Sequence, residues 1–408
     1  MKATYDVLVI GAGPAGSAAA VTAARAGASV LLVDKATFPR DKCCGDGLTT
    51  LALRQLDDLG FDAGSVASWC DVDGAWLRSP TGREVHVALP AGRGRYAAVA
   101  PRRELDAALV TLAERSGAEI AQGHGFAGFL PASPTDVRVE VTGLGEVAAR
   151  TVIAADGMWS PVRKALGLAE PGYLGEWHAF RQYARNVTGP AGRHLYVWFD
   201  EDLLPGYAWS FPLPDGRANI GFGVLRDGER RIQDMKSLWG DLLARPHVRA
   251  ALGDGFEMED RHTAWPIPAR IHQAVTGTGR VLFVGDAVRA TDVLTGEGIG
   301  QALLTGVEAA HAATGELAHD PAAVRRAYRL AVRHHLVADH RMSQVLGKVL
   351  SHRIGARGAI GVLGRVSETN RTRFARWMFE DEPRAVIATP SRWHRGFLNL
   401  PGASVSAG

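Results

Sequence analysis

A glycine fingerprint near the N-terminus restricts the fold of this chain more than any other feature. The apolar run Val7–Ile10 is followed by Gly11, Gly13 and Gly16, an Ala-rich helical stretch, and a second apolar run that ends at Asp34. In such a unit the glycines permit a tight turn, the approach of a pyrophosphate and close helix packing, while the acid accepts hydrogen bonds from a ribose. The helix N-terminus adds a positive dipole end. The stretch therefore predicts a buried parallel strand and a dinucleotide-binding site.

A second run with the same glycine spacing lacks this context. Residues 123–128 read GHGFAG, but Phe129, Leu130 and Pro131 follow, and a proline there interrupts any helix. We interpret this second run as a loop.

The composition is that of an ordinary globular enzyme. The 408 residues are 46% hydrophobic and 22% charged, and the formal net charge of +3 argues against a nucleic-acid partner. Because Cys43 and Cys44 are adjacent and Cys70 is the only other cysteine, we expect no disulfide framework and a reducing, cytoplasmic setting. The chain shows no signal peptide and no run of about 18 apolar residues that would span a membrane. We also expect no metal site.

Two segments further along the chain extend the nucleotide site. Asp156-Gly157 follows the β-branched run 151–155, and Ser160 and Arg163 are spaced to tie that turn down with hydrogen bonds. Arg102, at the start of an expected helix, is placed to reach the nucleotide phosphates. A solvated helix start is the alternative interpretation of Arg102.

A third turn indicates which dinucleotide is bound. Gly285-Asp286 follows the apolar strand 280–284, and the loop Gly296–Ile299 (GEGI) opens the next helix. Asp286 can accept a hydrogen bond from a ribityl hydroxyl, and the loop and helix N–H groups can face the pyrimidine edge of a flavin. The three turns together favour FAD.

These motifs resemble those of the FAD-dependent oxidoreductases of the glutathione-reductase type, in the branch with the p-hydroxybenzoate-hydroxylase fold. Within that branch the chain is similar to the geranylgeranyl reductase family. The loop Lys42–Gly47 (KCCGDG) resembles the family's K-P-C-G-G/D-G loop, and Pro205–Pro212 (PGYAWSFP) resembles its P-x-x-Y-x-W-x-F-P signature. The chain departs at three points: Cys43 replaces Pro, one residue separates Pro205 from the tyrosine, and Asp292-Val293 replaces Asn-Pro.

The resemblance implies FAD as the cofactor. We expect NADPH or reduced ferredoxin as the electron donor, bound only transiently, because no second dinucleotide fingerprint has a fitting context. The residues expected to bind FAD are Gly11, Gly13, Ala15, Gly16, Asp34, Lys35, Lys42, Cys44, Gly45, Arg102, Asp156, Gly157, Gly285, Asp286, Gly296, Glu297, Gly298 and Ile299.

The order of the elements predicts an α/β fold, in which a Rossmann-like FAD-binding domain carries an inserted antiparallel β-sheet substrate domain and C-terminal helices. Residues 1–70, 98–172 and 272–345 are assigned to the FAD-binding domain, 71–97 and 173–271 to the substrate domain, and 346–408 to a C-terminal helical region and tail. For the tail we favour a structural or tunnel-lining role over peripheral contact with a membrane.

One strand of the substrate domain carries three rings at a spacing of two. Tyr207, Trp209 and Phe211 therefore point to one face, where they either wall an apolar substrate cavity or form the core of the sheet. Val293 is expected to line the same substrate space. Cys44 and Tyr207 are the candidate proton donors, with Trp209 beside them, although Cys44 also fits a small buried residue.

The expected activity is FAD-dependent reduction of carbon–carbon double bonds in a hydrophobic prenyl, polyene or polyketide-like molecule, with hydride from flavin N5 and a proton from an active-site acid. The alternative is a monooxygenase that hydroxylates or epoxidises a natural-product intermediate through a C4a-hydroperoxide. A flavin halogenase, whose W-x-W-x-I-P signature is missing, and a non-enzymatic flavin-binding protein are less favoured. The substrate's identity and the oligomeric state stay open.

Overall fold

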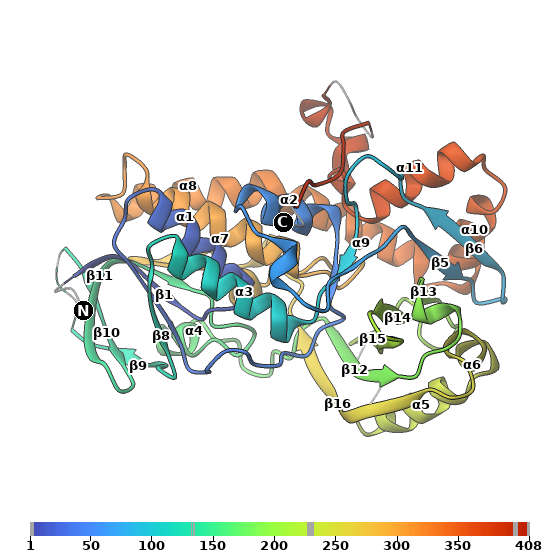
Figure 1. Cartoon of the computed structure of the whole chain (residues 1–408). Helices are drawn as coiled ribbons and strands as arrows, with labels where there is room; N and C mark the ends of the chain where they lie inside the picture. Colours follow the sequence, from blue (N-terminus) through green and yellow to red (C-terminus); the bar gives the residue numbers. More distant parts are fainter. Residues whose placement is uncertain (1–3, 132, 134, 227–231, 395–398, 406–408) are drawn as a thin grey trace.

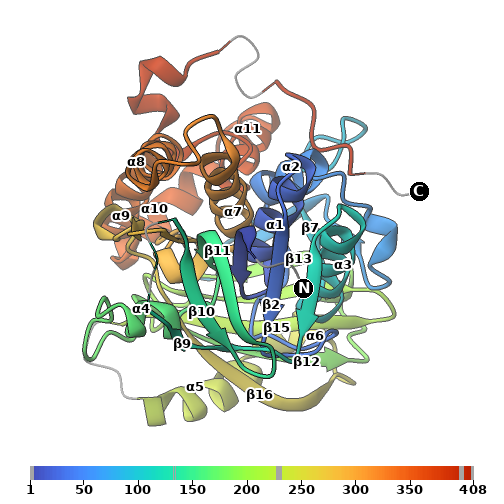
Figure 2. The same ribbon diagram turned by 90° about the vertical axis from the view of Figure 1, so that its left-hand side faces the viewer.

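The structure is a computed structural model that describes residues 4–131, 133, 135–226, 232–394 and 399–405. Two large sheets and a layer of helices make up the chain (Figure 1). One sheet and the helices α1, α3 and α7 form one half of the molecule, and the second sheet lies beside them with α5 and α6 on its far side (Figures 1 and 2). The predicted α/β class, with a Rossmann-like sheet and C-terminal helices, is confirmed.

The first sheet has the order β17-β18-β11-β1-β2-β8; β10 pairs with the first half of β11, and β9 pairs with β10. Its central strands are parallel and buried, and α1, α3 and α7 form a layer of helices packed against them. The strands are β1 (Tyr5–Ile10), β2 (Val30–Asp34), β8 (Glu119–Gln122), β9 (Phe126–Phe129), β10 (Val137–Val141), β11 (Gly145–Ala154), β17 (Gly277–Thr278) and β18 (Val281–Phe283).

Two glycines allow the helices to pack closely against this sheet and against each other. A Cβ at Gly16 in α1 would overlap the carbonyl oxygen of Gly11, and one at Gly306 in α7 would overlap that of Ala15. The α1 and α7 backbones therefore approach closely over the strand ends. The helices of this half are α1 (Pro14–Arg25), α2 (Thr50–Asp58), α3 (Arg102–Arg115), α4 (Pro161–Ala165), α7 (Ile299–Thr314) and α8 (Pro321–Val332).

The second sheet has the order β16-β12-β15-β14-β13-β5-β6 and is antiparallel except where β13 pairs with β5. Its first five strands come from residues after 173, and its last two come from residues 74–88. The elements are β5 (Gly74–Arg78), β6 (Glu84–Ala88), β12 (Trp177–Arg185), β13 (Leu195–Trp198), β14 (Tyr207–Leu213), β15 (Arg217–Leu225), β16 (Glu257–Ile267), α5 (Ile232–Ala244) and α6 (Pro246–Leu252).

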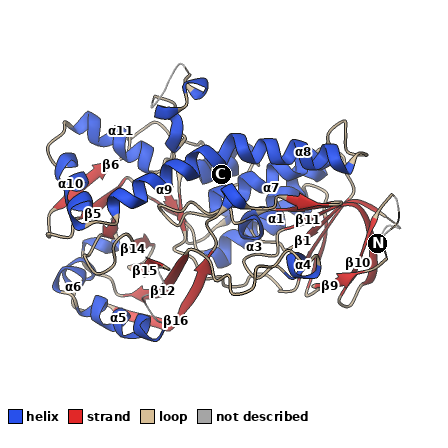
Figure 3. Cartoon of the chain, turned by 180° about the vertical axis from the view of Figure 1, so that it is seen from behind, coloured by secondary structure: helices blue, strands red, loops and turns tan. Residues whose placement is uncertain are grey.

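The C-terminal helices lie along the second sheet and extend the helical layer (Figures 1 and 3). A π-helical turn, Arg333–Val337, joins α8 to α9 (Ala338–Leu350), which is followed by α10 (Arg353–Leu363) and α11 (Glu368–Met378). β3 (Gly47–Leu48), β7 (Ala98–Val99) and β4 (Cys70–Asp71) form a separate small sheet in that order. No helix within the described residues is long and apolar enough to cross a membrane.

Three expectations about strands need correction. The run 123–128, which we interpret as a loop, contains the start of strand β9 at Phe126, and this strand pairs with β10. The run 151–155 is not a separate strand: residues 151–154 are the end of the long strand β11, which pairs with β10 at its start and with β1 and β18 at its end. The residue pattern of 257–267 does not predict a strand, yet β16 is the longest strand of the second sheet. The polar and apolar residues of β16 do not alternate. Its pairing with β12 holds this segment extended.

Candidate functional site

A large cavity occupies the space between the first sheet, the second sheet and α9–α11. Its volume is about 1520 Å³, which exceeds the usual 300–1,000 Å³ of a site for one drug-sized ligand. Residues just after β1, β2, β11 and β18 line one end. Ligands of open α/β sheets bind outside the carboxyl ends of the strands, so this end is the expected nucleotide site.

The glycine turn after β1 leaves backbone amides open to the cavity. Gly11 has φ of +102°, which few other residues adopt, and Gly13 is the N-cap of α1 with no side chain capping the helix. Asp34, at the end of β2, accepts hydrogen bonds from the amides of Ala12 at 2.7 Å and Ala36 at 2.8 Å. Gly16 does not line the cavity, because it packs against the Gly11 carbonyl behind the turn.

Two arginines lie beside this turn. Arg102 donates from Nε and Nη2 to the buried Asp106 at 2.7 and 2.8 Å, and Arg40 pairs with the same carboxylate at 2.8 Å. Both guanidinium groups lie within 4 Å of the position that a Cβ of Gly13 would take. Arg102 is thus not a solvated helix start: Asp106 holds it and Arg40 at the end of the cavity where a phosphate would enter.

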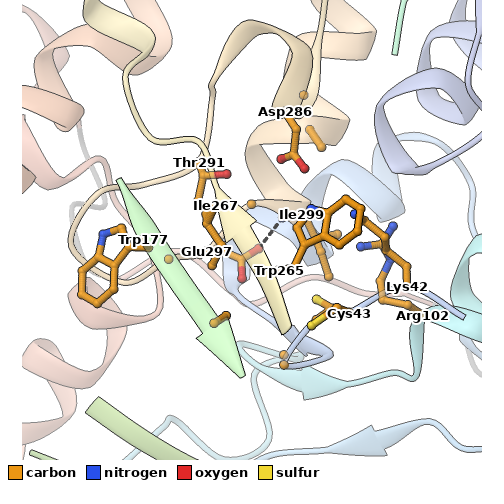
Figure 4. Close-up of a pocket in the computed structure, with 18 of the residues that line it drawn as sticks. Lys42, Cys43, Arg102, Trp177, Trp265, Ile267, Asp286, Thr291, Glu297 and Ile299 are labelled. Atoms are coloured by element: carbon orange, nitrogen blue, oxygen red, sulfur yellow. Dashed lines mark hydrogen bonds between the residues drawn. The ribbon is translucent and has the colours of Figure 1, made fainter. Parts of the chain in front are cut away.

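Charged groups continue along the cavity wall toward the second sheet (Figure 4). Asp156 Oδ2 accepts from the amide of Val162, while its Oδ1 is buried without a hydrogen-bond partner among the described residues. Burial raises the pKa of Asp156. Lys42 Nζ lies 3.3 Å from the ring centroid of Trp265, and burial lowers the pKa of Lys42 to about 8.

The loop before α7 differs from its expected role. The Glu297 carboxylate accepts hydrogen bonds from the amides of Ile299 at 2.9 Å and Gly300 at 3.1 Å, so it caps the helix that was expected to offer those amides to a flavin (Figure 4). Burial and the neighbouring Glu380 raise the pKa of Glu297. The loop residues still line the cavity, but the first free amides of α7 are already satisfied.

Asp292, one of the departures from the family pattern, organises the same loop. Its Oδ1 accepts from the amides of Leu294 and Thr295, at 3.0 and 2.9 Å. Its Oδ2 accepts from Ser343 of α9 at 2.6 Å and pairs with Arg384 at 3.4 Å. The carboxylate therefore ties the loop to the C-terminal helices.

The cysteine loop is held by one buried carboxylate. Asp46 accepts hydrogen bonds from the Tyr183 hydroxyl at 2.5 Å, from Asn219 Nδ2 at 2.7 Å and from the Arg102 amide at 3.2 Å. Asn219 also donates to the Cys44 carbonyl at 2.9 Å. Burial raises the pKa of Asp46 to about 6, and these donors partly oppose that shift. The network joins the loop to β12 and β15.

The cysteine side chain itself stays protonated at neutral pH. Cys44 is half-buried at the cavity wall, its Sγ accepts from the Asp46 amide at 3.4 Å, and burial raises the pKa of the thiol to about 12. Cys43 also lines the cavity, and its Sγ lies 3.6 Å from the Thr263 carbonyl. Cys70 does not line the cavity.

The three rings of β14 lie in a row along the cavity. Adjacent centroids are 6.0 Å apart for Tyr207 and Trp209 and 5.9 Å for Trp209 and Phe211. The Trp209 and Phe211 rings lie 3.3–3.5 Å from where a Cβ of Gly45 would be, so a side chain there would press on both. Trp209 Nε1 donates to Asn219 at 3.1 Å, and the Tyr207 hydroxyl donates to the Thr295 carbonyl.

Beyond the rings the cavity becomes apolar. Its walls are strands of the second sheet on one side and α9–α11 on the other, and the lining residues include Leu77, Leu195, Val197, Phe199, Leu346, Leu350, Ile360, Leu363, Phe374 and Met378. Val293 is not part of this lining, contrary to expectation. Its carbonyl accepts from Trp177 Nε1 at 2.9 Å, while the next two residues line the cavity.

A model of the FAD binding domain family matches residues 4–319. The menaquinone reductase of Mycobacterium tuberculosis (strain CDC 1551 / Oshkosh) is 33% identical over 340 residues, with 74% of each chain covered. The digeranylgeranylglycerophospholipid reductase of Methanosarcina acetivorans is 31% identical over 322 residues, covering 77% of this chain and 76% of that relative. The chain belongs to the geranylgeranyl reductase family. It is accordingly an FAD-dependent oxidoreductase.

The fold agrees with that of a solved protein. A geranylgeranyl bacteriochlorophyll reductase-like protein from Thermoplasma acidophilum superposes with a TM-score of 0.79 at 22% identity, covering 96% of this chain and 99% of that one. At that identity the likeness concerns the fold alone.

The residues at the glycine-rich end fit FAD. The uncapped α1 N-terminus and the two arginines suit a pyrophosphate, and the unpartnered Asp156 Oδ1 is a buried acceptor that lacks a donor. The cavity volume leaves room for a second molecule beside the cofactor.

Several site residues escape sequence reasoning. Arg40, Glu380 and Arg384 line the cavity or support its loops, yet none belongs to a motif or to a recognisable pattern. Asp46 is part of the KCCGDG motif, but nothing in that motif indicates that its carboxylate bonds to Asn219, which is 173 positions away.

Proposed function

We propose that this protein reduces carbon–carbon double bonds in a long, apolar, prenyl-type molecule. The apolar arm of the cavity carries this proposal, because a wall of aliphatic and aromatic side chains favours a lipid-like ligand over a polar one. The arm begins at the β14 rings and the Cys44 loop, where a reacting double bond would meet the cofactor. The related menaquinone and digeranylgeranylglycerophospholipid reductases are named for prenylated substrates, which supports the same class.

Residues of the chain would supply the proton and the geometry. FAD in its reduced form supplies a hydride. Cys44 would give the proton to the other carbon, since its thiol remains protonated at neutral pH and lines the cavity. Tyr207 is the weaker donor, because its hydroxyl already donates to the Thr295 carbonyl. Trp209 and Phe211 would press the alkene against the loop and exclude water.

The test uses the purified flavoprotein, reduced without oxygen. Adding a geranylgeranyl lipid, which has no quinone ring, should reoxidise the flavin and yield a product two hydrogens heavier. In D₂O both added hydrogens should be deuterium, because the N5–H of reduced flavin exchanges with the solvent. If only oxygen reoxidises the flavin and the product gains an oxygen atom, the protein is a monooxygenase and the proposal is wrong.

A pair of cysteine variants tests the proton donor. Cys44→Ala should lower alkene turnover at least 100-fold while leaving photoreduction of the flavin unchanged. Cys70→Ala is the matched control, because that cysteine lies outside the cavity. Equal turnover of the two variants would remove Cys44 from the mechanism.

A further inference from the structure

The stretch from residue 340 to residue 367 has an unusual charge pattern. It contains no Asp or Glu, although the chain has 43 of them among 408 residues, and it carries five cations: Arg341, Lys348, Arg353, Arg357 and Arg365. All five are exposed and belong to α9, α10 or the turn after α10. The nearest recorded acidic partner is Glu201, whose carboxylate lies 3.3 Å from Arg353 in an exposed pair. Such a pair neutralises little of the positive field.

The same two helices also expose large apolar side chains. Ile354 is 80% exposed, Val345 59%, Val362 58% and Val349 54%. Isolated exposed aliphatics are common on proteins, but these four lie within 18 residues that carry cations and no acidic side chain. We refer to residues 341–365 as the basic apolar platform. Amphipathic helices of this composition lie in the plane of a lipid interface.

The platform lies at the mouth of the apolar arm of the cavity. Val349 and Ala359 are both exposed and part of the cavity lining, so the cavity reaches the surface between α9 and α10. Leu346, Leu350 and Ile360, from the same helices, continue the lining inward. A lipid chain entering here would pass from the outer face of the platform into the cavity along apolar side chains.

We propose that the basic apolar platform docks the protein on a bilayer rich in anionic lipids, with the cavity mouth facing the membrane. The cations complement acidic headgroups, and the four aliphatic side chains insert among the upper acyl chains. A second copy of the chain is the other candidate occupant. A symmetric dimer through this face would set five cations against five, which opposes its formation. Docking is independent of the proposed function, whereas the entry of a prenyl-type lipid from the bilayer rests on it.

Vesicle sedimentation of the full-length flavoprotein tests this docking. The protein should sediment with phosphatidylcholine vesicles that contain 30% phosphatidylglycerol, and far less with pure phosphatidylcholine. Binding should weaken as salt rises from 0.05 to 0.5 M, because surface charges are screened. Lys348→Gln with Arg357→Gln should lower the partition coefficient by roughly 25-fold, since each cation near an anionic surface contributes about five-fold. Ile354→Asp should lower it further.

Matched controls separate docking from general charge and stability. Arg103→Gln with Arg115→Gln removes two exposed cations from α3, and Leu317→Asp changes a 64% exposed leucine in the turn after α7. Helix α3 and the α7–α8 turn lie away from α10 (Figure 1). These variants should bind vesicles like the parent, and all variants should keep their FAD. Equal loss in controls and platform variants, or no preference for anionic vesicles, would overturn the proposal. So would a dimer in solution that the platform variants convert to a monomer.

The two proposals fail separately. Platform variants should still reduce a detergent-dispersed prenyl substrate, because none of the substituted residues lines the cavity. If the parent and the variants bind vesicles as expected but none of them reduces an alkene, the proposed function is rejected and the docking proposal stands.

Discussion

The crossing of α1 and α7 offers a sharp test of how this fold holds its cofactor site. A Cβ added at Gly306 would lie 2.1 Å from the Ala15 carbonyl oxygen and 3.0 Å from its carbon, whereas ordinary contacts begin at 3.4 Å. The helices would have to separate by more than 1 Å. Overpacking of this kind costs about 1–3 kcal/mol or more, which outweighs the roughly 1 kcal/mol that alanine contributes to a helix interior. Gly306→Ala should therefore destabilise the protein and weaken FAD binding.

Gly347→Ala is the matched control for this substitution. Gly347 lies inside α9, and a Cβ there would meet no atom within 4 Å, so alanine should stabilise the helix by about 1 kcal/mol. For a chain of this length the melting temperatures of the two variants should differ by roughly 2–5 °C, in opposite directions from the parent. Thermal unfolding and the flavin content of the purified proteins measure both effects. If Gly306→Ala stabilises as Gly347→Ala does, or keeps full FAD, the close-contact reasoning is refuted.

Three further predictions concern buried carboxylates of the site. Asp46→Ala should cost about 2–5 kcal/mol in urea unfolding, because it strands the buried Asn219 amide and Tyr183 hydroxyl, whereas Asp46→Asn, which keeps the positive φ, should cost less. Burial raises the pKa of Glu380, so its contribution to stability is complete below its unfolded pKa and is lost as pH rises through the folded value. Glu380→Gln should flatten that decline between pH 5 and 8 in urea titrations, and an unchanged slope would contradict it. Asp156→Asn should keep the melting temperature of the apoprotein yet lower FAD affinity at least ten-fold, measured by flavin fluorescence; unchanged affinity would contradict a role for Oδ1.

The features that could be predicted from the sequence are those that depend on backbone geometry and on the order of neighbouring residues. The turn after β1 is readable because Gly11 needs a positive φ and an apolar strand precedes it. The self-capping of α7 by Glu297 was not readable, because a side-chain rotamer decides whether the helix amides face the ligand or a neighbouring carboxylate. Pairing of β16 with β12 was hidden for a different reason: the pattern of β16 does not alternate.

One wall of the cavity could be predicted from the sequence, and the opposite wall could not. Sequence spacing predicted the shared face of Tyr207, Trp209 and Phe211, since the period of a strand is local. The opposite wall comes from α9–α11, and no property of those helices taken alone indicates which of their residues meet β14 across the cavity. Arg384 is an example, because its partner Asp292 is visible only once the chain has folded back.

The pairing of β11 with β18 has a consequence for how the chain is made. Val152 of β11 pairs with Val281, so most of the second sheet must leave the ribosome between the two partners. Until residues 281–283 emerge, the last residues of β11 have a neighbour on the β1 side only and present an apolar edge that can recruit foreign strands. The nascent protein therefore passes through a period of exposure set by the length of the insertion. Fragments that end before residue 281 should aggregate even though they contain the complete glycine fingerprint.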